Sequence, residues 1–472
     1  MQPREFDLIV IGAGAVGENV ADRAVQGGLT VAMVEAELVG GDCSYWACMP
    51  SKALLRAGAV TRAATSVGGV GPVGAIDPSA AFARRDAITH NWDDSSQVEW
   101  AQGVGIEVIR GHGRLDGERR VVVTSADGST LELVATHAVA IATGSAALLP
   151  DIPGLLDLNP WTSRDATSAN AVPRSLAVLG GGVVGAEMAT AYSDFGSHVT
   201  LIARSGLLGG QEPFAGDRVT AALRARGVDV RTGVEVVAAR LEGGDRVLEL
   251  SDGSEVRAAE VLVATGRVAR TGDLGLESIG LTPGDWLDVD DTLRVRGHDW
   301  LYAVGDVNHR ALLTHQGKYQ GRAAGDVIAA RAQGQDVDDG PWGRHVATAD
   351  HTAVPQVTFT DPEVASVGLT AVAAERAGHH IRVVDYDLSW LAGASVQADD
   401  YAGSARAVID EDRKVLLGMT LVGSGVGELI HAATVAIVGE VPLDRLWHAV
   451  PSYPTLSEVW LRLLETYGRD SA

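Results

Sequence analysis

The sequence predicts an α/β fold with two Rossmann-like nucleotide-binding domains and a C-terminal domain of the α+β type. A glycine-rich fingerprint directly follows a short apolar run at residues 12–17 and again at residues 180–185, which predicts the two nucleotide-binding domains. From Pro341 onward, runs typical of strands and helices alternate in a different pattern, which predicts the third domain. A chain of 472 residues is long enough for two to four domains.

The first fingerprint has the order of strand, turn and helix that dinucleotide binding requires. The apolar run at residues 7–11 predicts a strand, Gly12, Gly14 and Gly17 follow it, and Glu35 ends the next apolar run. The glycines permit a tight turn and let the backbone approach a pyrophosphate, which the N-terminus of the next helix binds. An acid about 20 residues further on accepts the ribose hydroxyls. A glycine-rich turn without a ligand is the alternative, and the flanking strand and acid disfavour it.

The second fingerprint lacks this acid. Gly180, Gly182 and Gly185 follow an apolar run, but the next predicted strand ends in Ala203-Arg204. A carboxylate would repel a 2′-phosphate at this position, whereas an arginine can pair with one. The sequence therefore favours NADPH over NADH, with a solvated surface arginine as the alternative interpretation.

The only two cysteines, Cys43 and Cys48, lie close together, shortly after the first fingerprint. A structural disulfide normally joins distant segments, whereas a pair with this spacing can open and close without unfolding the chain. We therefore expect a redox-active dithiol that exchanges electrons with a flavin.

Composition excludes several functions. The net charge of −23 argues against nucleic acid as a partner, because phosphate binding requires clustered positive charge. No apolar run approaches 18 residues, and the first strand begins too soon after Met1 for a signal peptide. A reversible dithiol without other cysteines fits a reducing compartment, so we expect a cytoplasmic protein.

Further motifs follow in a fixed order along the whole chain. Together with the cysteine segment, they make the sequence resemble the two-cysteine, FAD-dependent pyridine nucleotide–disulfide oxidoreductases. This is the group of dihydrolipoamide dehydrogenase, glutathione reductase and mercuric reductase. The motifs do not specify the substrate. They occupy residues 141–144, 263–267, 303–307, 359–368 and 454–458.

The resemblance implies an FAD-binding domain in two parts, residues 1–154 and 269–340, on either side of an NAD(P)-binding domain at 155–268. Residues 341–472 would form the dimerisation domain of a homodimer, whose active site the partner subunit completes. The expected strands include 228–237, 247–250, 300–304, 357–359, 381–384 and 414–422, and the expected helices include 313–331, 371–377, 426–438 and 456–466.

The resemblance also implies roles for individual residues. Cys43 would attack the exchanging substrate, and Cys48 would face the flavin. A lowered thiolate pKa would help both, and a helix that begins near Pro50 would favour the Cys48 thiolate. Lys52 and Glu187 would form the ion pair beside the flavin N5 atom. Further cofactor-binding residues implied by the motifs are Thr143, Gly144, Gly266, Gly305, Asp306 and His315.

The sequence departs from the family at one catalytic position. Disulfide reductases of the family carry a histidine before the Pro-Thr motif and a glutamate that orients it. Here Glu458 is present, but Tyr453 stands at the histidine position. A tyrosine with a pKa near 10 is a poor base at neutral pH, although it can donate a hydrogen bond. His448 has no catalytic counterpart in the family, so we interpret it as structural.

Two more departures bear on the substrate. Tyrosine at position 453 resembles mercuric reductase, but that enzyme relays metal through a further cysteine pair, and this chain has no cysteine left. Mercury reduction is therefore disfavoured. Tyr45 and Trp46 lie between the cysteines, where they would narrow the approach to Cys43, stack on an aromatic acceptor, or fill local core.

The sequence thus predicts an NAD(P)H-dependent flavoprotein disulfide oxidoreductase of the dihydrolipoamide dehydrogenase type. Its substrate would be a small disulfide or dithiol. An alternative keeps the flavin and dithiol but passes electrons to a quinone, a metal ion or oxygen, which need no histidine base. A non-catalytic, redox-sensing flavoprotein subunit is the alternative of another class. Metal cofactors are not expected.

Overall fold

The computed structural model describes residues 3–469 and divides the chain into two compact units. Each unit combines segments that are distant in the sequence. Unit 1 comprises the chain up to Pro50 with residues 86–147 and 267–351, and unit 2 comprises residues 51–85, 148–266 and the chain from Thr352 onward.

Unit 1 is built on a seven-stranded sheet. Its strands are β1 (Arg4–Ile11), β2 (Val31–Glu35), β3 (Ile106–Arg110), β4 (His112–Leu115), β5 (Arg120–Thr124), β6 (Thr130–Ile141) and β16 (Leu301–Ala303). They follow the order β3-β2-β1-β6-β5-β4, and β16 also pairs with β6. β1, β2, β3, β6 and β16 pair in parallel, whereas β4 and β5 form an antiparallel extension. Residues 8–11 of β1 are almost fully buried, as expected for a parallel strand covered on both faces.

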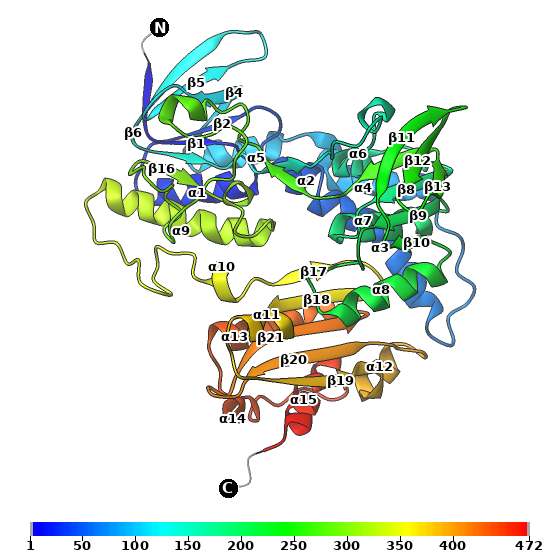
Figure 1. Ribbon diagram of the computed structural model, residues 1–472. Helices are drawn as coiled ribbons and strands as arrows, with labels where there is room; N and C mark the ends of the chain where they lie inside the picture. Colours follow the sequence, from blue (N-terminus) through cyan, green and yellow to red (C-terminus); the bar gives the residue numbers. More distant parts are fainter. Residues whose placement is uncertain (1–2, 470–472) are drawn as a thin grey trace. The chain divides into compact units, whose positions relative to one another are not determined.

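Two helices of unit 1, α1 (Ala15–Gln26) and α9 (Thr314–Ala332), lie side by side (Figure 1). Gly317, Gly321 and Gly325 form a stripe along α9 at the spacing of one helical turn. A Cβ atom on Gly321 would lie 2.9 Å from the backbone oxygen of Val16. Because glycine has no Cβ, the two backbones approach closely, and this fixes the side chains that both helices present beside the sheet.

The remaining elements of unit 1 are short or end at its boundary. β7 (Ser145–Ala147) pairs antiparallel with β15 (Arg267–Ala269). The helix α3 begins in unit 1 and continues into unit 2. The helix α4 (Pro78–Ile88) lies mostly in unit 2 and ends in unit 1. The other helices are α2 (Gly41–Tyr45), α3 (Cys48–Thr65), α5 (Ser95–Gly103) and α10 (Ala349–Thr352).

Unit 2 contains three sheets. The first is parallel, with the order β10-β9-β8-β14, the second is the antiparallel β11-β12-β13, and the third is the antiparallel β17-β18-β21-β20-β19. The strands are β8 (Ser175–Leu179), β9 (His198–Ala203), β10 (Asp229–Thr232), β11 (Val236–Glu242), β12 (Asp245–Leu250), β13 (Glu255–Ala258), β14 (Glu260–Val263), β17 (Gln356–Thr358), β18 (Glu363–Gly368), β19 (Ile381–Asp387), β20 (Ser404–Asp410) and β21 (Val415–Gly423).

The helices of unit 2 flank these sheets. They are α6 (Ser163–Ser168), α7 (Val183–Asp194), α8 (Pro213–Ala225), α11 (Ala371–Arg376), α12 (Ala392–Gln397), α13 (Ile430–Val438), α14 (Leu443–Leu446) and α15 (Val459–Tyr467). α7 is buried along most of its length and contacts β8 and β9, and most of its residues are small or apolar, with the buried Glu187 as an exception. The predicted fold class, with Rossmann-like sheets and a C-terminal α+β region, is confirmed.

Three predicted elements needed correction. The single strand expected at 228–237 is wrong, because Gly233 adopts a left-handed φ of +77° and separates β10 from β11, which join different sheets. The helices expected at 426–438 and 456–466 each begin with a separate 3₁₀ turn, Val426–Glu428 and Leu456–Glu458.

Candidate active site

The two cysteines lie on consecutive helices, and both residues belong to unit 1. Cys43 is on α2, and Cys48 is the first residue of α3 rather than lying ahead of a helix near Pro50, as the sequence suggested. The backbone N–H of Gly40 donates a hydrogen bond of 2.8 Å to the oxygen of Ala13 in the first fingerprint. The Sγ atom of Cys48 lies 3.3 Å from Oγ1 of Thr314, the first residue of α9. The dithiol is therefore fixed against both α1 and α9.

The two thiols are not equivalent. The hydrogen bond with Cys48 raises the pKa of the Cys43 thiol, burial and the charge of a Cys48 thiolate raise this pKa further, and Thr314 and Lys318 oppose the shift. A lowered pKa would help Cys43 as a nucleophile, so the raised pKa means that this thiol needs a base before it can attack. The two thiols interact so closely that they titrate as a pair.

The first fingerprint has the shape of a dinucleotide site. Gly12 has a φ of +101°, and a Cβ atom there would lie 2.5 Å from the oxygen of Ala142. Gly14 caps α1 without a side-chain hydrogen bond among the described residues, so the N–H groups of the first turn can bind a pyrophosphate. Oε2 of Glu35, at the end of β2, accepts a 2.7 Å hydrogen bond from the N–H of Ala13. Burial raises the pKa of this carboxyl.

A polar cluster lies beside the second predicted FAD segment. Oδ2 of Asp306 accepts a 2.5 Å hydrogen bond from the Ser145 hydroxyl, which itself accepts one of 2.5 Å from Nε of Arg267. Burial raises the pKa of Asp306, and the hydrogen bond and Arg267 oppose the shift. Arg267 also lies 3.5 Å from Asp42, next to Cys43. Ser145 and Arg267 were not predicted as site residues, although Arg267 ends a motif that carried the resemblance.

The other residues predicted to bind FAD lie near this cluster or at the start of α9. Gly144 precedes Ser145 and has a φ of +74°, and Gly305 precedes Asp306 with a φ of +81°. Oγ1 of Thr143 donates a 2.8 Å hydrogen bond to the oxygen of Arg270. His315 is the second residue of α9. These residues fit an extended dinucleotide between the first fingerprint and α9.

The second fingerprint lines a cavity of about 530 Å³ within unit 2. Gly180, Gly182 and Gly266 line it, and Gly182 caps α7 without a side-chain hydrogen bond among the described residues. Gly185 lies one turn into α7. Arg204 also lines the cavity, is 81% exposed, and approaches Glu235 with 3.9 Å between Nε and Oε1.

The predicted ion pair between Lys52 and Glu187 is present in unit 2. Nζ of Lys52 lies 2.8 Å from Oε2 of Glu187, which is only 3% exposed. The other carboxylate oxygen, Oε1, accepts a 2.9 Å hydrogen bond from the N–H of Phe359. Nζ of Lys52 also lies 5.0 Å from the centre of the Phe359 ring. Two donors thus hold the buried carboxylate, and it orients a half-exposed lysine.

Tyr453 and Glu458 do not form the hydrogen-bonded pair that the histidine and glutamate of the family would form. Tyr453 is 76% exposed, whereas Glu458 is 5% exposed. Oε1 of Glu458 accepts a 2.5 Å hydrogen bond from Arg462, and its buried Oε2 has no partner among the described residues. Within the described chain, no hydrogen bond joins Tyr453 to Glu458. His448 is exposed after α14.

Tyr45, one of the two aromatic residues between the cysteines, fills local core. Its side chain is fully buried, and its hydroxyl lies 3.4 Å from the oxygen of Asp93. Trp46 is half-buried and packs against Tyr45 with 5.7 Å between ring centres. Tyr45 therefore cannot stack on an acceptor, whereas Trp46 keeps an exposed part.

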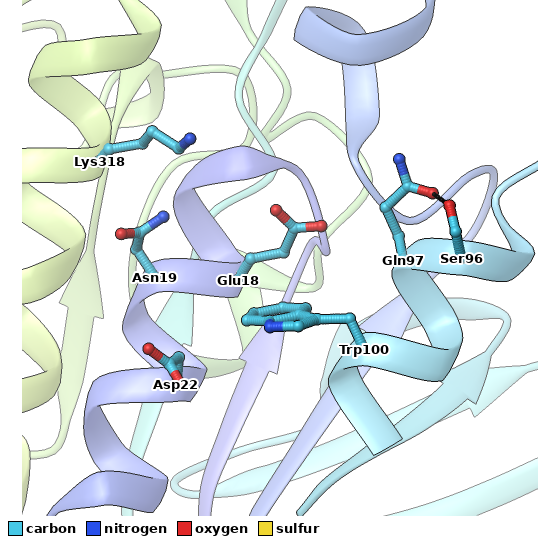
Figure 2. Close-up of a pocket in the computed structure, with 7 residues that line it drawn as sticks. All are labelled: Glu18, Asn19, Asp22, Ser96, Gln97, Trp100 and Lys318. Carbon is cyan, nitrogen blue, oxygen red and sulfur yellow. Dashed lines mark hydrogen bonds between the residues drawn. The ribbon is translucent and has the colours of Figure 1, made fainter. Parts of the chain in front are cut away.

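A pocket of about 400 Å³ that was not predicted lies between α1, α5 and α9 (Figure 2). Its charged lining residues are Glu18, Asp22 and Lys318. Burial raises the pKa of Glu18 to about 7, with Lys318 opposing the shift and Glu35 adding to it. The only local signal was an acid in the first turn after the fingerprint.

The described residues contain neither a candidate metal site nor a candidate membrane span. Within residues 3–469, no cluster of three or more histidine, cysteine, aspartate or glutamate side chains could hold a metal ion. In the same range, no helix combines the length and hydropathy that a membrane span requires.

Comparison with known proteins identifies the family. Residues 6–334 match the model of the pyridine nucleotide-disulphide oxidoreductases, and residues 354–463 match the dimerisation domain of the same family. The chain belongs to the pyridine nucleotide-disulphide oxidoreductases. It is an NAD(P)H-dependent flavoprotein disulfide oxidoreductase, and the family uses FAD and NAD(P)H.

Relatives of this oxidoreductase carry more than one activity. A mercuric reductase from Streptomyces lividans is 32% identical over 99% of this chain and 97% of its own. A dihydrolipoyl dehydrogenase from Haloferax volcanii is 32% identical over 97% of this chain and 95% of its own. The solved structure of LpdA from Mycobacterium tuberculosis has the same fold, with a TM-score of 0.83, 24% identity and coverage of 98% and 99%.

Proposed function

We propose that this oxidoreductase uses NADPH to reduce a small disulfide, or oxidises the matching dithiol in the reverse direction. The observation that carries the proposal is the placement of the dithiol, with Cys43 on α2 beside the first fingerprint and the sulfur of Cys48 3.3 Å from Thr314 at the start of α9. In such a dithiol one sulfur exchanges with the substrate, and the other then attacks the first and restores the disulfide. The relatives named dihydrolipoyl dehydrogenase support this class of substrate.

The residues of the chain carry out the exchange in two steps. When bound, FAD would supply hydride chemistry and deliver an electron pair to the Cys43–Cys48 disulfide. Cys43, once deprotonated, attacks one sulfur of the substrate disulfide, and the other sulfur leaves as a thiolate and takes up a proton. The Cys48 thiolate then attacks Cys43, which restores the disulfide and releases the second substrate thiol. Lys52, oriented by Glu187, would stabilise negative charge on the reduced cofactor.

We also propose a cytoplasmic homodimer whose active site is completed by the partner subunit. The match to a dimerisation domain supports this. Several large apolar side chains near the C-terminus are exposed in the single chain, as a buried interface would require. They are Val435, Val438, Val450 and Tyr453.

A second candidate function transfers the electrons to a quinone, a metal ion or oxygen. The exposed Tyr453, without a hydrogen bond to Glu458, favours it, because these acceptors need no histidine base. Relatives named mercuric reductase also favour a metal acceptor. Against mercury stands the absence of any cysteine beyond Cys43 and Cys48.

An acceptor screen separates these functions. Steady-state rates are measured with NADPH and NADH against lipoamide, low-molecular-weight disulfides, quinones and oxygen. Turnover of at least one disulfide above all other acceptors supports the proposed function. Turnover of quinone or oxygen alone contradicts it and supports the second candidate.

The preference for NADPH rests on Arg204, which lines the second cavity with no acid at the end of β9. We expect kcat/KM to favour NADPH, and Arg204→Ala to erase this preference. The expected loss is about 1–3 kcal/mol, typical of a hydrogen bond to a charged group. The matched control is Arg174→Ala, because Arg174 is also exposed and pairs with one acid but lies outside the cavity. Equal efficiency of the wild type with both nucleotides would contradict the assignment.

A further inference from the structure

Two walls of the pocket between α1, α5 and α9 come from α1 and α9, whose N-terminal ends contact the cysteine segment. Gly14 forms a backbone bridge with Gly40, next to α2, and Glu18 is one turn further along α1. Thr314 contacts Cys48, and Lys318 is one turn further along α9. Residues four apart share a helix face, so Glu18 and Lys318 continue the walls that hold the cysteines.

Glu18 is half-buried at this pocket, and one of its carboxylate oxygens is fully buried. Its Oε1 atom has no hydrogen-bond partner among the described residues, although the side chain lines the cavity. The charged and titratable groups that face it are Lys318 on α9, Asp22 on α1, Glu35 on β2 and Tyr45 on α2. α5 contributes only neutral side chains to the lining. A lone cation thus faces several acids, and burial raises the pKa of Glu18 to about 7.

Disulfide exchange needs a group that can take up a proton and release it again near neutral pH. The hydrogen bond with Cys48 and burial raise the pKa of the Cys43 thiol, so a base must take its proton before the sulfur can attack. The leaving thiolate of the substrate must then receive a proton. Tyr453, at the position of the family histidine, does this badly near neutral pH. Lys318 acts electrostatically on both Cys43 and Glu18, so all three groups share one environment.

We propose that Glu18 is the proton-exchanging group of the dithiol, with Lys318 as its positioning residue. The Glu18 carboxylate takes the proton of Cys43 as the sulfur attacks, and the resulting carboxylic acid gives it to the leaving thiolate. The proton is conserved over this step, and the electron pair moves only between sulfur atoms. This inference rests on the proposed disulfide exchange for its biological use, but the protonation of Glu18 can be measured without a substrate.

The test compares Glu18→Gln, which keeps the size of the side chain and removes the acid, with Glu99→Gln. Glu99 lies on α5 next to a lining residue but outside the pocket, and it is exposed. The holoenzyme is reduced anaerobically with one equivalent of NADPH, and infrared difference spectra are recorded from pH 5.5 to 8.5. We expect a protonated-carboxyl band that titrates near pH 7 in the wild type and in Glu99→Gln and is lost in Glu18→Gln.

Turnover of lipoamide gives a second readout. We expect the wild-type rate to rise as pH passes through about 7, because the carboxylate form of Glu18 then becomes populated. Glu18→Gln should lower the rate at pH 7 by about 10²-fold, the lower end for a positioned base, and shift the rise to alkaline pH. Reduction of ferricyanide, which needs no thiol proton, should stay unchanged.

The infrared titration and the turnover measurement distinguish failure of the proposed function from failure of the assignment of Glu18. If the wild type reduces no disulfide but the carboxyl band titrates as expected, the proposed function fails and the assignment of Glu18 stands. If the wild type shows no such band, or Glu18→Gln retains it, the assignment of Glu18 is overturned, whatever the substrate.

Discussion

Replacing either cysteine with serine is expected to abolish disulfide turnover, and the two variants should differ in their spectra. In the wild type, one equivalent of reductant should produce a long-wavelength absorption band from the Cys48 thiolate beside the bound flavin. Cys48→Ser should lose this band, because only Cys43 remains and its sulfur is not the one that faces the flavin. Cys43→Ser should show a band even without reductant, because Cys48 can no longer be held in the disulfide. Anaerobic visible spectroscopy measures both.

The structure gives this expectation a physical basis. Cys48 lies at the start of α3, where the helix dipole favours an anion, and Thr314 is within hydrogen-bonding distance of its sulfur. The hydrogen bond with Cys48 raises the pKa of Cys43, which disfavours a thiolate at Cys43. Ser44→Ala, between the cysteines on α2, is the matched control and should keep the wild-type band. Spectra that neither cysteine substitution changes would show that the thiol roles are wrong.

Local patterns were enough to predict most of the fold. The runs that became β1, β8 and β9 are continuous and apolar because parallel strands are buried on both faces, and the fingerprints mark the turns after β1 and β8. The prediction of a single strand at 228–237 was wrong for a local reason. The alternation of apolar and polar residues does not show that Gly233 turns the chain between two sheets.

The site was predicted where motifs carry its residues. Lys52 and Glu187 are far apart in the sequence, yet their predicted contact is present at 2.8 Å. The pocket of Glu18 and Lys318 was missed because it depends on the packing of α1 against α9, and neither residue belongs to a motif. The raised pKa of Cys43 was missed for a similar reason. It depends on the distance and charge of its neighbour and not on residue type.

Tyr453→His is expected to increase disulfide turnover at pH 7. The substitution places an imidazole with a pKa near 6.5 five positions before Glu458, whose buried Oε2 has no partner among the described residues. Glu458 can then accept a hydrogen bond from this histidine and orient its ring. A positioned acid–base group typically contributes 10²–10⁴-fold, which sets the upper limit of the gain. The measurement is kcat/KM for lipoamide as a function of pH.

The size of this gain depends on what already carries the proton. If Glu18 does so in the wild type, Tyr453→His should help modestly alone and far more in a Glu18→Gln background, where no nearby acid titrates near neutrality. Reduction of a quinone or of ferricyanide should hardly change in any of these variants. Tyr453→Phe is the control, because it keeps the ring and removes only the hydroxyl, and it should leave disulfide turnover close to the wild-type rate. Fast wild-type turnover that collapses in both Tyr453→His and Tyr453→Phe would instead show that the tyrosine hydroxyl itself takes part in the exchange. In that case neither the histidine of the family nor Glu18 would be needed to explain how this dithiol moves its proton.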